Sequence, residues 1–255
     1  MKKIWTIALN SFRENIRDRI LYNLLVFALL MIVLSIALVQ LSTGEWERIT
    51  IDVGLGSISI FGSLMAIFLG ISLVSKEIER RTIYTLLSKP VSRTFFLLGK
   101  YFGLVLTILV NMIIMAAVYL LILYYLHGHF SWAQAQALIL IFLSLMVVVA
   151  IALFFSTFST PTLSAIFTLS LFVIGHLTGE IRHFSEQSAS ALVKYFGRAV
   201  YYLLPNLSNY SLVDNATFGQ ALELQSFFNL ILVGLLTAAF ILALASLVLE
   251  KRDFL

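Results

Sequence analysis

Apolar residues gather in six long runs along this chain, with polar stretches between them. A helix needs about 20 mainly apolar residues to cross the hydrocarbon core of a bilayer. The runs cover residues 21–41, 55–74, 97–126, 137–158, 163–178 and 227–249. They lack the apolar–polar alternation of a membrane-spanning strand. The pattern predicts an all-α polytopic membrane protein with six transmembrane helices, the third long enough to tilt or protrude and the fifth short.

The first 20 residues carry an amphipathic pattern instead of an apolar run. Apolar side chains recur at Trp5, Leu9, Phe12, Ile16 and Ile20, and polar ones recur on the opposite face at Lys3, Thr6, Asn10, Arg13 and Arg17. This spacing is typical of a helix that lies in a membrane interface with its basic face toward anionic head groups. Arginines interrupt any signal-peptide core. We expect an interfacial helix over residues 1–20, and a cytosolic helix packed on a partner is the alternative.

The composition supports the same class of protein. Of the 255 residues, 60% are hydrophobic and 12% are charged, whereas roughly 25% are charged in an ordinary soluble domain. The mean hydropathy is +0.99. These values exclude a soluble globular domain and a disordered chain. The chain has no cysteine, which excludes disulfide bonds, thiolate metal sites and thiol catalysis.

Basic residues are divided unevenly between the two sides that six spans define. Four lie on one side, at Arg48, Arg182, Lys194 and Arg198. The other 13 of the 17 lie on the side of both termini, at Lys2, Lys3, Arg13, Arg17, Arg19, Lys76, Arg80, Arg81, Lys89, Arg93, Lys100, Lys251 and Arg252. Lys and Arg accumulate on the cytoplasmic side of membrane proteins. We therefore expect a multi-pass protein of the inner (cytoplasmic) membrane with both termini in the cytoplasm.

A charged segment over residues 75–96 joins the second and third spans on that side. It reads SKEIERRTIYTLLSKPVSRTFF. Helix-forming residues continue to Lys89, Pro90 stops the helix, and Ser92 is placed to cap the next one. Glu77 and Arg81 form an i,i+4 pair. The segment predicts a short charged helix at the cytoplasmic surface, and a solvated basic loop is the alternative.

Motifs in and around this segment resemble the signature of ABC-2 type transporter permeases. They are Glu79-Arg80-Arg81-Thr82-Ile83, Leu86-Leu87-Ser88, Pro90-Val91-Ser92-Arg93 and Gly99-Lys100. The resemblance extends over the amphipathic N-terminus, the six spans and the final Lys251-Arg252-Asp253-Phe254, so it covers the whole chain. It is closest to the branch that contains the permease of the nitrous oxide reductase maturation system. One position departs from the pattern, because relatives often carry Gly where this chain has Arg81.

The resemblance implies the membrane half of a transporter. Two copies, most simply a homodimer, would pair across a central pathway, and a separate ATPase with its own ATP and Mg²⁺ would dock beneath each. The helix between spans two and three would be a coupling helix that inserts into the ATPase. The contact positions that this resemblance implies are Lys76, Glu77, Glu79, Arg80, Arg81, Thr82, Leu86, Leu87, Ser88, Pro90, Ser92 and Arg93.

The chain has no catalytic signature of its own. It lacks a GxxxxGK phosphate loop followed by Ser or Thr, and it lacks HExxH and GxSxG. Its histidines, at positions 127, 129, 176 and 183, are weak metal candidates. No acidic or basic residue lies centrally in a span, and Lys100 is close enough to the cytoplasm to snorkel. We expect no enzyme activity, no cofactor or metal in this chain, and no nucleic-acid partner.

Two stripes within the spans are candidates for the dimer interface and the pathway. The small residues Ser59, Ser63, Ala66 and Gly70 allow close helix approach, and Thr160, Ser164, Thr168 and His176 form a polar face. Ordinary packing against a neighbouring helix is the alternative for both stripes. Asn111 is expected to hydrogen-bond between helices. We predict a two-fold interface built by spans one, two and five.

The long outer segment, residues 179–226, predicts short helices rich in interfacial aromatics such as Tyr195, Phe196, Tyr201 and Tyr202. It would roof the pathway or hold an extracytoplasmic protein. The leading interpretation is the permease subunit of an ATP-driven exporter. The alternatives are a mechanotransmission subunit that drives an extracytoplasmic maturation or assembly partner, and a membrane-embedded enzyme. The substrate is open, from lipid to peptide to a metal–sulfur species.

Overall fold

The computed structural model describes residues 2–41, 46–79, 92–127, 130–188 and 190–251, and every regular element among them is helical. The elements are α1 (Lys2–Asn15), α2 (Arg19–Leu41), α3 (Trp46–Glu79), α5 (Arg93–His127), α6 (Trp132–Ser156), α7 (Pro161–Gln187), α8 (Ala191–Leu203), the 3₁₀ helix η1 (Leu207–Tyr210), α9 (Val213–Thr217) and α10 (Leu224–Lys251). Six of these are long and apolar enough to cross a membrane, namely α2, α3, α5, α6, α7 and α10. The prediction of six transmembrane helices is confirmed.

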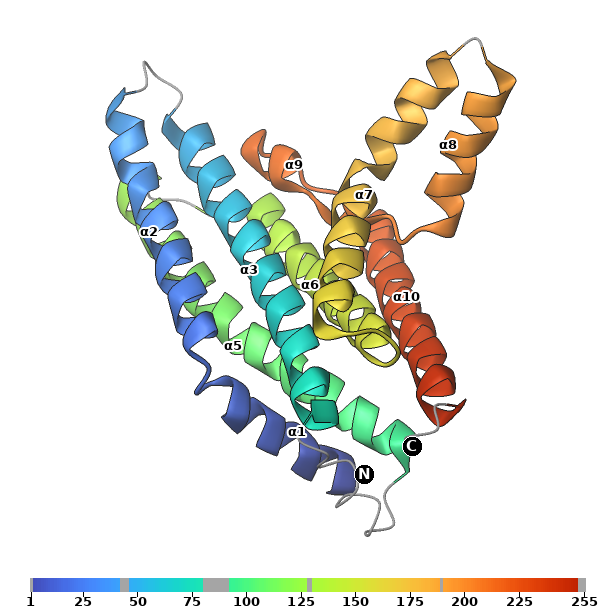
Figure 1. Cartoon of the computed structure of the whole chain (residues 1–255). Coiled ribbons are helices and arrows are strands. Elements are labelled where there is room, and N and C mark those ends of the chain that lie inside the picture. The colour runs from blue at the N-terminus through green and yellow to red at the C-terminus, as the bar shows by residue number, and fades with distance from the viewer. Residues whose placement is uncertain (1, 42–45, 80–91, 128–129, 189, 252–255) are drawn as a thin grey trace.

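Helices α3 and α6 form the centre of the bundle. In each of them 67% of the most apolar window is buried, whereas in α2, α7 and α10 the share is 22%. Figure 1 shows α2 on one side of this central pair, α7 and α10 on the other, and α5 crossing behind from α2 toward the end of α10. The two central helices approach closely because glycines face the partner: a Cβ at Gly62 would lie 2.8 Å from Leu145 Cδ1. Small residues permit such contact where hydrophobic driving force is absent.

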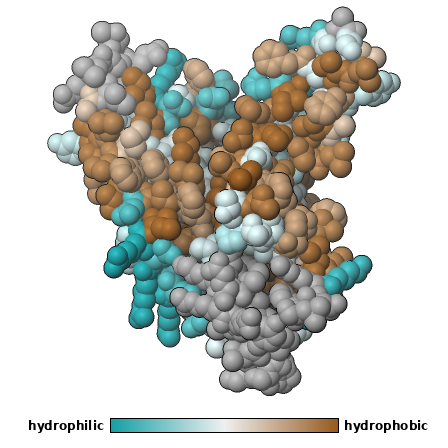
Figure 2. All heavy atoms as spheres, viewed as in Figure 1, coloured by the Kyte–Doolittle hydropathy of each residue, from teal (hydrophilic) through white to brown (hydrophobic). Residues whose placement is uncertain are grey.

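Both ends of the described chain lie at one end of the bundle, which we call the terminal end; the opposite end is the distal end (Figure 1). Helix α1 lies across the terminal end, and α10 finishes there. Figure 2 shows apolar side chains over most of the visible face, and polar ones gathered over α1 at the terminal end. The lateral surface of the bundle is therefore apolar and its terminal end is polar, as in a membrane-embedded protein.

Several helices are longer than their apolar runs. Helix α3 begins at Trp46, nine residues before the apolar run of residues 55–74. This stretch continues the helix because Thr50 and Ile51 are buried against the bundle, and Glu47 in the first turn suits a helix N-terminus. Helix α7 likewise extends to Gln187, well past the predicted span of residues 163–178.

A proline sets the start of α7. Pro161 occupies the first turn, and the preceding Thr160 has an extended backbone with ψ 160°. Pro is favoured there because the amide N–H that it lacks would have no partner in the first turn. The backbone N–H of Ser164 donates to the Thr160 carbonyl over 2.8 Å. Pro161 thus begins α7, and four residues separate it from the end of α6 at Ser156.

The distal end carries a helical hairpin made by the second half of α7 and by α8 (Figure 1). These helices are in close contact at Gly197, where a Cβ would collide with the Ser185 side chain. Beyond the hairpin, η1 and α9 return across the bundle. The Gln136 side chain fastens this return, because its Nε2 donates to the Leu222 carbonyl over 3.0 Å and its Oε1 accepts from the Leu222 N–H over 2.8 Å.

Candidate functional site

The predicted coupling residues divide into three groups. Lys76, Glu77 and Glu79 fall in the last turns of α3, at the terminal end. Ser92 and Arg93 begin α5 at the same end. Arg80, Arg81, Thr82, Leu86, Leu87, Ser88 and Pro90 lie outside the residues that the structure describes. The structure therefore fixes where the coupling segment leaves and re-enters the bundle, at the adjoining ends of α3 and α5.

The re-entry point is a capped helix start. The backbone N–H of Phe95 donates to Ser92 Oγ over 3.3 Å. A serine in this position satisfies one of the N–H groups that the first turn of a helix leaves without a partner. The prediction that Ser92 caps the third span is confirmed.

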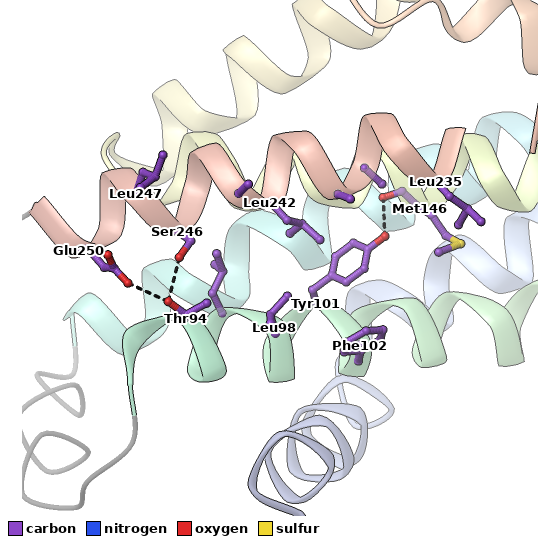
Figure 3. Close-up of a pocket in the computed structure, with 14 residues that line it drawn as sticks. Thr94, Leu98, Tyr101, Phe102, Met146, Leu235, Leu242, Ser246, Leu247 and Glu250 are labelled. Carbon is purple, nitrogen blue, oxygen red and sulfur yellow. Dashed lines mark hydrogen bonds between the residues drawn. The ribbon is translucent and has the colours of Figure 1, made fainter. Parts of the chain in front are cut away.

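The next two residues join α5 to the end of α10. Arg93 Nη1 donates to the Leu249 carbonyl over 2.9 Å and to the Glu250 carbonyl over 3.1 Å. Thr94 Oγ1 shares a hydrogen bond of 2.9 Å with Ser246 Oγ and donates to Glu250 Oε1 over 2.9 Å (Figure 3). Cationic side chains suit the carbonyl groups at a helix C-terminus. We call these five residues the terminal joint.

A second attachment fixes α1 to α5. A Cβ at Gly99 would lie 2.7 Å from Ile7 Cβ, and a Cβ at Gly103 would lie 2.6 Å from Ser11 Cβ and 2.7 Å from the Ala8 carbonyl oxygen. Only glycine leaves room for backbones this close. Sequence reasoning missed the role of this pair, although two glycines four residues apart in an apolar helix are a recognised signal of close packing.

The buried face of α1 differs from the predicted one. Ala8, Ser11 and Asn15 are the residues that it buries, whereas Trp5 of the predicted apolar face is 59% exposed. Small side chains therefore make the most buried part of the docking face, and Ile7 packs beside them against Gly99. The exposed Trp5 is free to contact lipid, so the interfacial position of α1 stays a prediction.

Polar groups lie beneath α1 at this docking face. Lys100 is 2% exposed, so the prediction that it snorkels to the surface is wrong. Its Nζ lies 3.9 Å from Glu14 Oε2 and 5.6 Å from the centroid of the Phe96 ring. Two turns further along α5, Thr107 Oγ1 accepts a hydrogen bond from Asn15 Nδ2 of α1 over 3.4 Å. Helix α1 covers the lysine and supplies its nearest carboxylate, which removes the need to reach the surface.

Asn111 is buried and its amide donates to the Thr107 carbonyl over 2.8 Å. That hydrogen bond lies within α5, so it does not supply the interhelical contact that we expected. Asn and Thr side chains often bond to the carbonyl one turn back, which satisfies a polar group in an apolar setting.

The small-residue stripe of the second span lies inside the chain. Ser63 and Ala66 are buried and Ser59 is half-buried. A Cβ at Gly70 would lie 2.6 Å from Ala152 Cβ of α6. The stripe therefore serves as a close-packing face, and the helix it meets here is α6 of the same chain.

The polar stripe of the fifth span is also mostly internal. Thr160 is exposed at the start of α7, but Ser164 and Thr168 are buried. Thr168 Oγ1 donates to the Ser164 carbonyl over 2.7 Å, and His176 Nδ1 lies 3.0 Å from the Phe172 carbonyl oxygen. Thr168 and His176 thus bond to backbone carbonyls of their own helix, whereas the buried Ser164 Oγ has no hydrogen-bond partner among the described residues. Their predicted part in a pathway stays a prediction.

The hairpin of α7 and α8 presents aromatic surface at the distal end. The exposed residues include Phe184, Tyr195, Phe196 and Tyr202, each at least two thirds exposed. Arg182 bridges the hairpin, since its Nε lies 3.0 Å from Glu186 Oε1 and its guanidinium stacks 4.5 Å from the Tyr201 ring centroid. At the foot of the hairpin Thr178 Oγ1 donates to Asn206 Oδ1 over 2.7 Å.

The described residues contain no group of three or more His, Asp or Glu side chains that could hold a metal ion. His183 lies beside Gln187, with 2.9 Å between their Nε2 atoms. The contacts of Asn15, Arg93 and Thr94 join α5 to its neighbours α1 and α10. What this arrangement can do is transmit a displacement from the terminal end through α5 to α1 and α10.

Six helices long and apolar enough to cross a membrane define a multi-pass membrane protein. A family model described as ABC-2 family transporter protein matches residues 5–254. The chain belongs to the ABC-2 transporter family. Curated proteins show no match to it.

Proposed function

We propose that this chain is the permease subunit of an ATP-driven exporter and that a separate ATPase, holding ATP and Mg²⁺, supplies its energy. The observation that carries the proposal is the terminal joint beside the re-entry of the coupling segment, in a chain that belongs to the ABC-2 family. Hydrogen bonds between α5 and α10 at that position would carry a force that enters through the coupling segment.

The proposed mechanism uses the connections of α5. A displacement of the coupling segment would act on Arg93 at the first residue of α5. Hydrogen bonds pass it to Leu249 and Glu250 of α10, and the glycine contacts pass it to α1. Each neutral hydrogen bond contributes only about 1 kcal/mol, and bonds to charged groups contribute more. Several contacts acting together make α1, α5 and α10 move as a unit.

We further propose that the chain acts as a homodimer in the inner membrane with its terminal end in the cytoplasm. The excess of basic residues at that end supports the orientation. The apolar faces of α2 and α7 support the pairing, because they are exposed on this chain; examples are Phe27 at 58% and Ile166 at 53%. A pathway would then form between two chains.

The coupling assignment is tested by charge reversal. The double substitution Arg80→Glu and Arg81→Glu should abolish co-purification with the proposed ATPase subunit, because it reverses two charges at the proposed contact. The control Arg198→Glu makes the same kind of charge change at the distal end and should leave the complex intact. Retention of both the complex and ATP-dependent transport by the double variant would overturn the assignment.

Mechanotransmission without transport is the second candidate function. The observation that favours it is the hairpin of α7 and α8, whose exposed aromatics Phe184, Tyr195 and Phe196 offer a surface for a partner. This function fits the branch of the nitrous oxide reductase maturation permease. Replacing Tyr195 and Phe196 by serine should then abolish maturation of the partner while ATPase stimulation survives. An exporter would instead keep moving its substrate.

A further inference from the structure

A cleft opens sideways between α5 and α10 near the terminal end (Figure 3). Leu98, Tyr101 and Phe102 line it from α5, Leu235 and Leu242 line it from α10, and Met146 of α6 lies at its floor. Its volume is about 660 Å³, within the range of roughly 300–1,000 Å³ that ligand pockets span.

The walls of the cleft are fixed at several points. At the terminal end Thr94 is bonded to Ser246. At the floor the Tyr101 hydroxyl donates to the Met146 carbonyl over 3.4 Å. Higher up, a Cβ at Gly234 would lie 2.5 Å from Leu143 Cδ2, so α10 already touches α6 there. The space is preformed, because α10 cannot move inward and the small side chain of Ala243 leaves it open.

The shape of the cleft fits one extended hydrocarbon chain. Its lining on α10 runs from Leu235 to Glu250, which is about 22 Å of helix at a rise of 1.5 Å per residue. Spread over that length, the volume gives a cross-section of about 30 Å², far below that of a helix 10–12 Å across. The rim residues Phe102 and Leu247 are 47% and 55% exposed. Water does not fill an apolar cavity of this kind, whereas lipid surrounds it.

Apart from the Tyr101 hydroxyl, the polar groups of the cleft gather at its terminal end. The Glu250 carboxylate lies beside the hydroxyl groups of Thr94 and Ser246. A carboxylate has several acceptor sites, of which Thr94 uses one. Lys251 follows on the same helix turn and is exposed. A head group with a primary ammonium and a phosphate matches this pair of charges. A quaternary ammonium has no N–H to donate, and an anionic head group would face the carboxylate.

We propose that this cleft binds an acyl chain of a phosphatidylethanolamine molecule from the leaflet at the terminal end, with the ammonium of the head group donating to Glu250. The lipid would wedge α5 from α10 directly above the terminal joint. The proposal needs only a membrane-embedded chain, so it stands apart from the transport proposal.

The experiment offers the purified full-length chain an equimolar mixture of phosphatidylethanolamine, phosphatidylcholine and phosphatidylglycerol in detergent. Retained lipid is counted by native mass spectrometry. We expect phosphatidylethanolamine to exceed phosphatidylcholine by roughly tenfold or more, the factor that one hydrogen bond to a charged group supplies. Retention in the ratio of the mixture would overturn the proposal, since it indicates ordinary surface lipid.

Two variants separate the acyl chain from the head group. Ala243→Phe fills the cleft and should remove the retained lipid, whereas Ala117→Phe, on an exposed part of α5 outside the cleft, should not. Glu250→Gln keeps an acceptor for Thr94 but loses the charge, so it should retain lipid and lose the preference for the ethanolamine head group. Equal retention by the two phenylalanine variants would overturn the site. Disulfide-linked dimers from Ala243→Cys would assign the cleft to a second chain and would also overturn it.

Discussion

Lys100 holds a positive charge beneath α1, in a part of the bundle where an unpaired charge is costly. Its nearest carboxylate, Glu14, is 45% exposed and lies 3.9 Å away. Solvent screens such a pair, so its net contribution is small. The lysine also packs its stem against the bundle and lies over the Phe96 ring. The main effect of this residue is therefore to attach α1 to α5, and its contribution to the stability of either helix alone is small.

The first prediction concerns this pair. Glu14→Gln should destabilise the protein by about 1 kcal/mol, because it removes a carboxylate that lies beside the buried lysine. Lys100→Met should cost less, since it removes the buried charge while keeping the length of the side chain. Thermal unfolding of the purified protein in detergent measures both. A larger loss for Lys100→Met than for Glu14→Gln would show that the ammonium has other, stronger contacts.

At the scale of elements, the docking of α1 depends on a glycine. Gly103→Ala should destabilise the bundle by about 1–3 kcal/mol, because the added Cβ would lie 2.6 Å from Ser11 Cβ and 2.7 Å from the Ala8 carbonyl oxygen. Gly56→Ala is the matched control in α3, where a Cβ meets nothing within 4 Å. That variant should gain up to about 1 kcal/mol of helix propensity.

Thermal unfolding in detergent measures the stability of both glycine variants. Release of α1 also exposes Lys100 to solvent, so an amine-reactive label should modify the Gly103→Ala protein faster than the parent. Equal stability of the two variants would show that α1 has room to shift along α5.

The elements themselves could be predicted from the sequence, since each apolar run is long enough to span a bilayer and Pro161 ends a helix by its chemistry. Their neighbours could not. A stripe such as Ser63, Ala66 and Gly70 specifies close approach but does not say whether the partner helix belongs to the same chain, and here Gly70 meets Ala152. The burial of Lys100 could not be predicted from the sequence either, because it depends on where α1 packs.

At the scale of the whole molecule, the bundle leaves its outer helices open on one side. The central helices α3 and α6 are mostly buried, whereas α2 and α7 expose apolar faces. Figure 2 shows a hollow at the distal end between α2 and α3 on one side and the α7–α8 hairpin on the other. Two chains that pair through α2 and α7 would cover both faces and enclose that hollow.

The last prediction tests this pairing by cross-linking. The chain has no native cysteine, so single substitutions report position without background. Val33→Cys on α2 and Val173→Cys on α7, at sites 50% and 46% exposed, should form disulfide-linked dimers in membranes. Phe240→Cys on α10 is the comparison, because its site is 65% exposed and lies on a helix outside the proposed pair of α2 and α7. The stripes at Ser63 and Thr168 are poor probe sites, since both residues are buried within one chain. Cross-links are read on non-reducing gels across a range of expression levels, because a specific dimer persists on dilution and random collision does not. Dimers that form through Phe240→Cys alone would place the interface at α10 and rule out a pathway between α2 and α7.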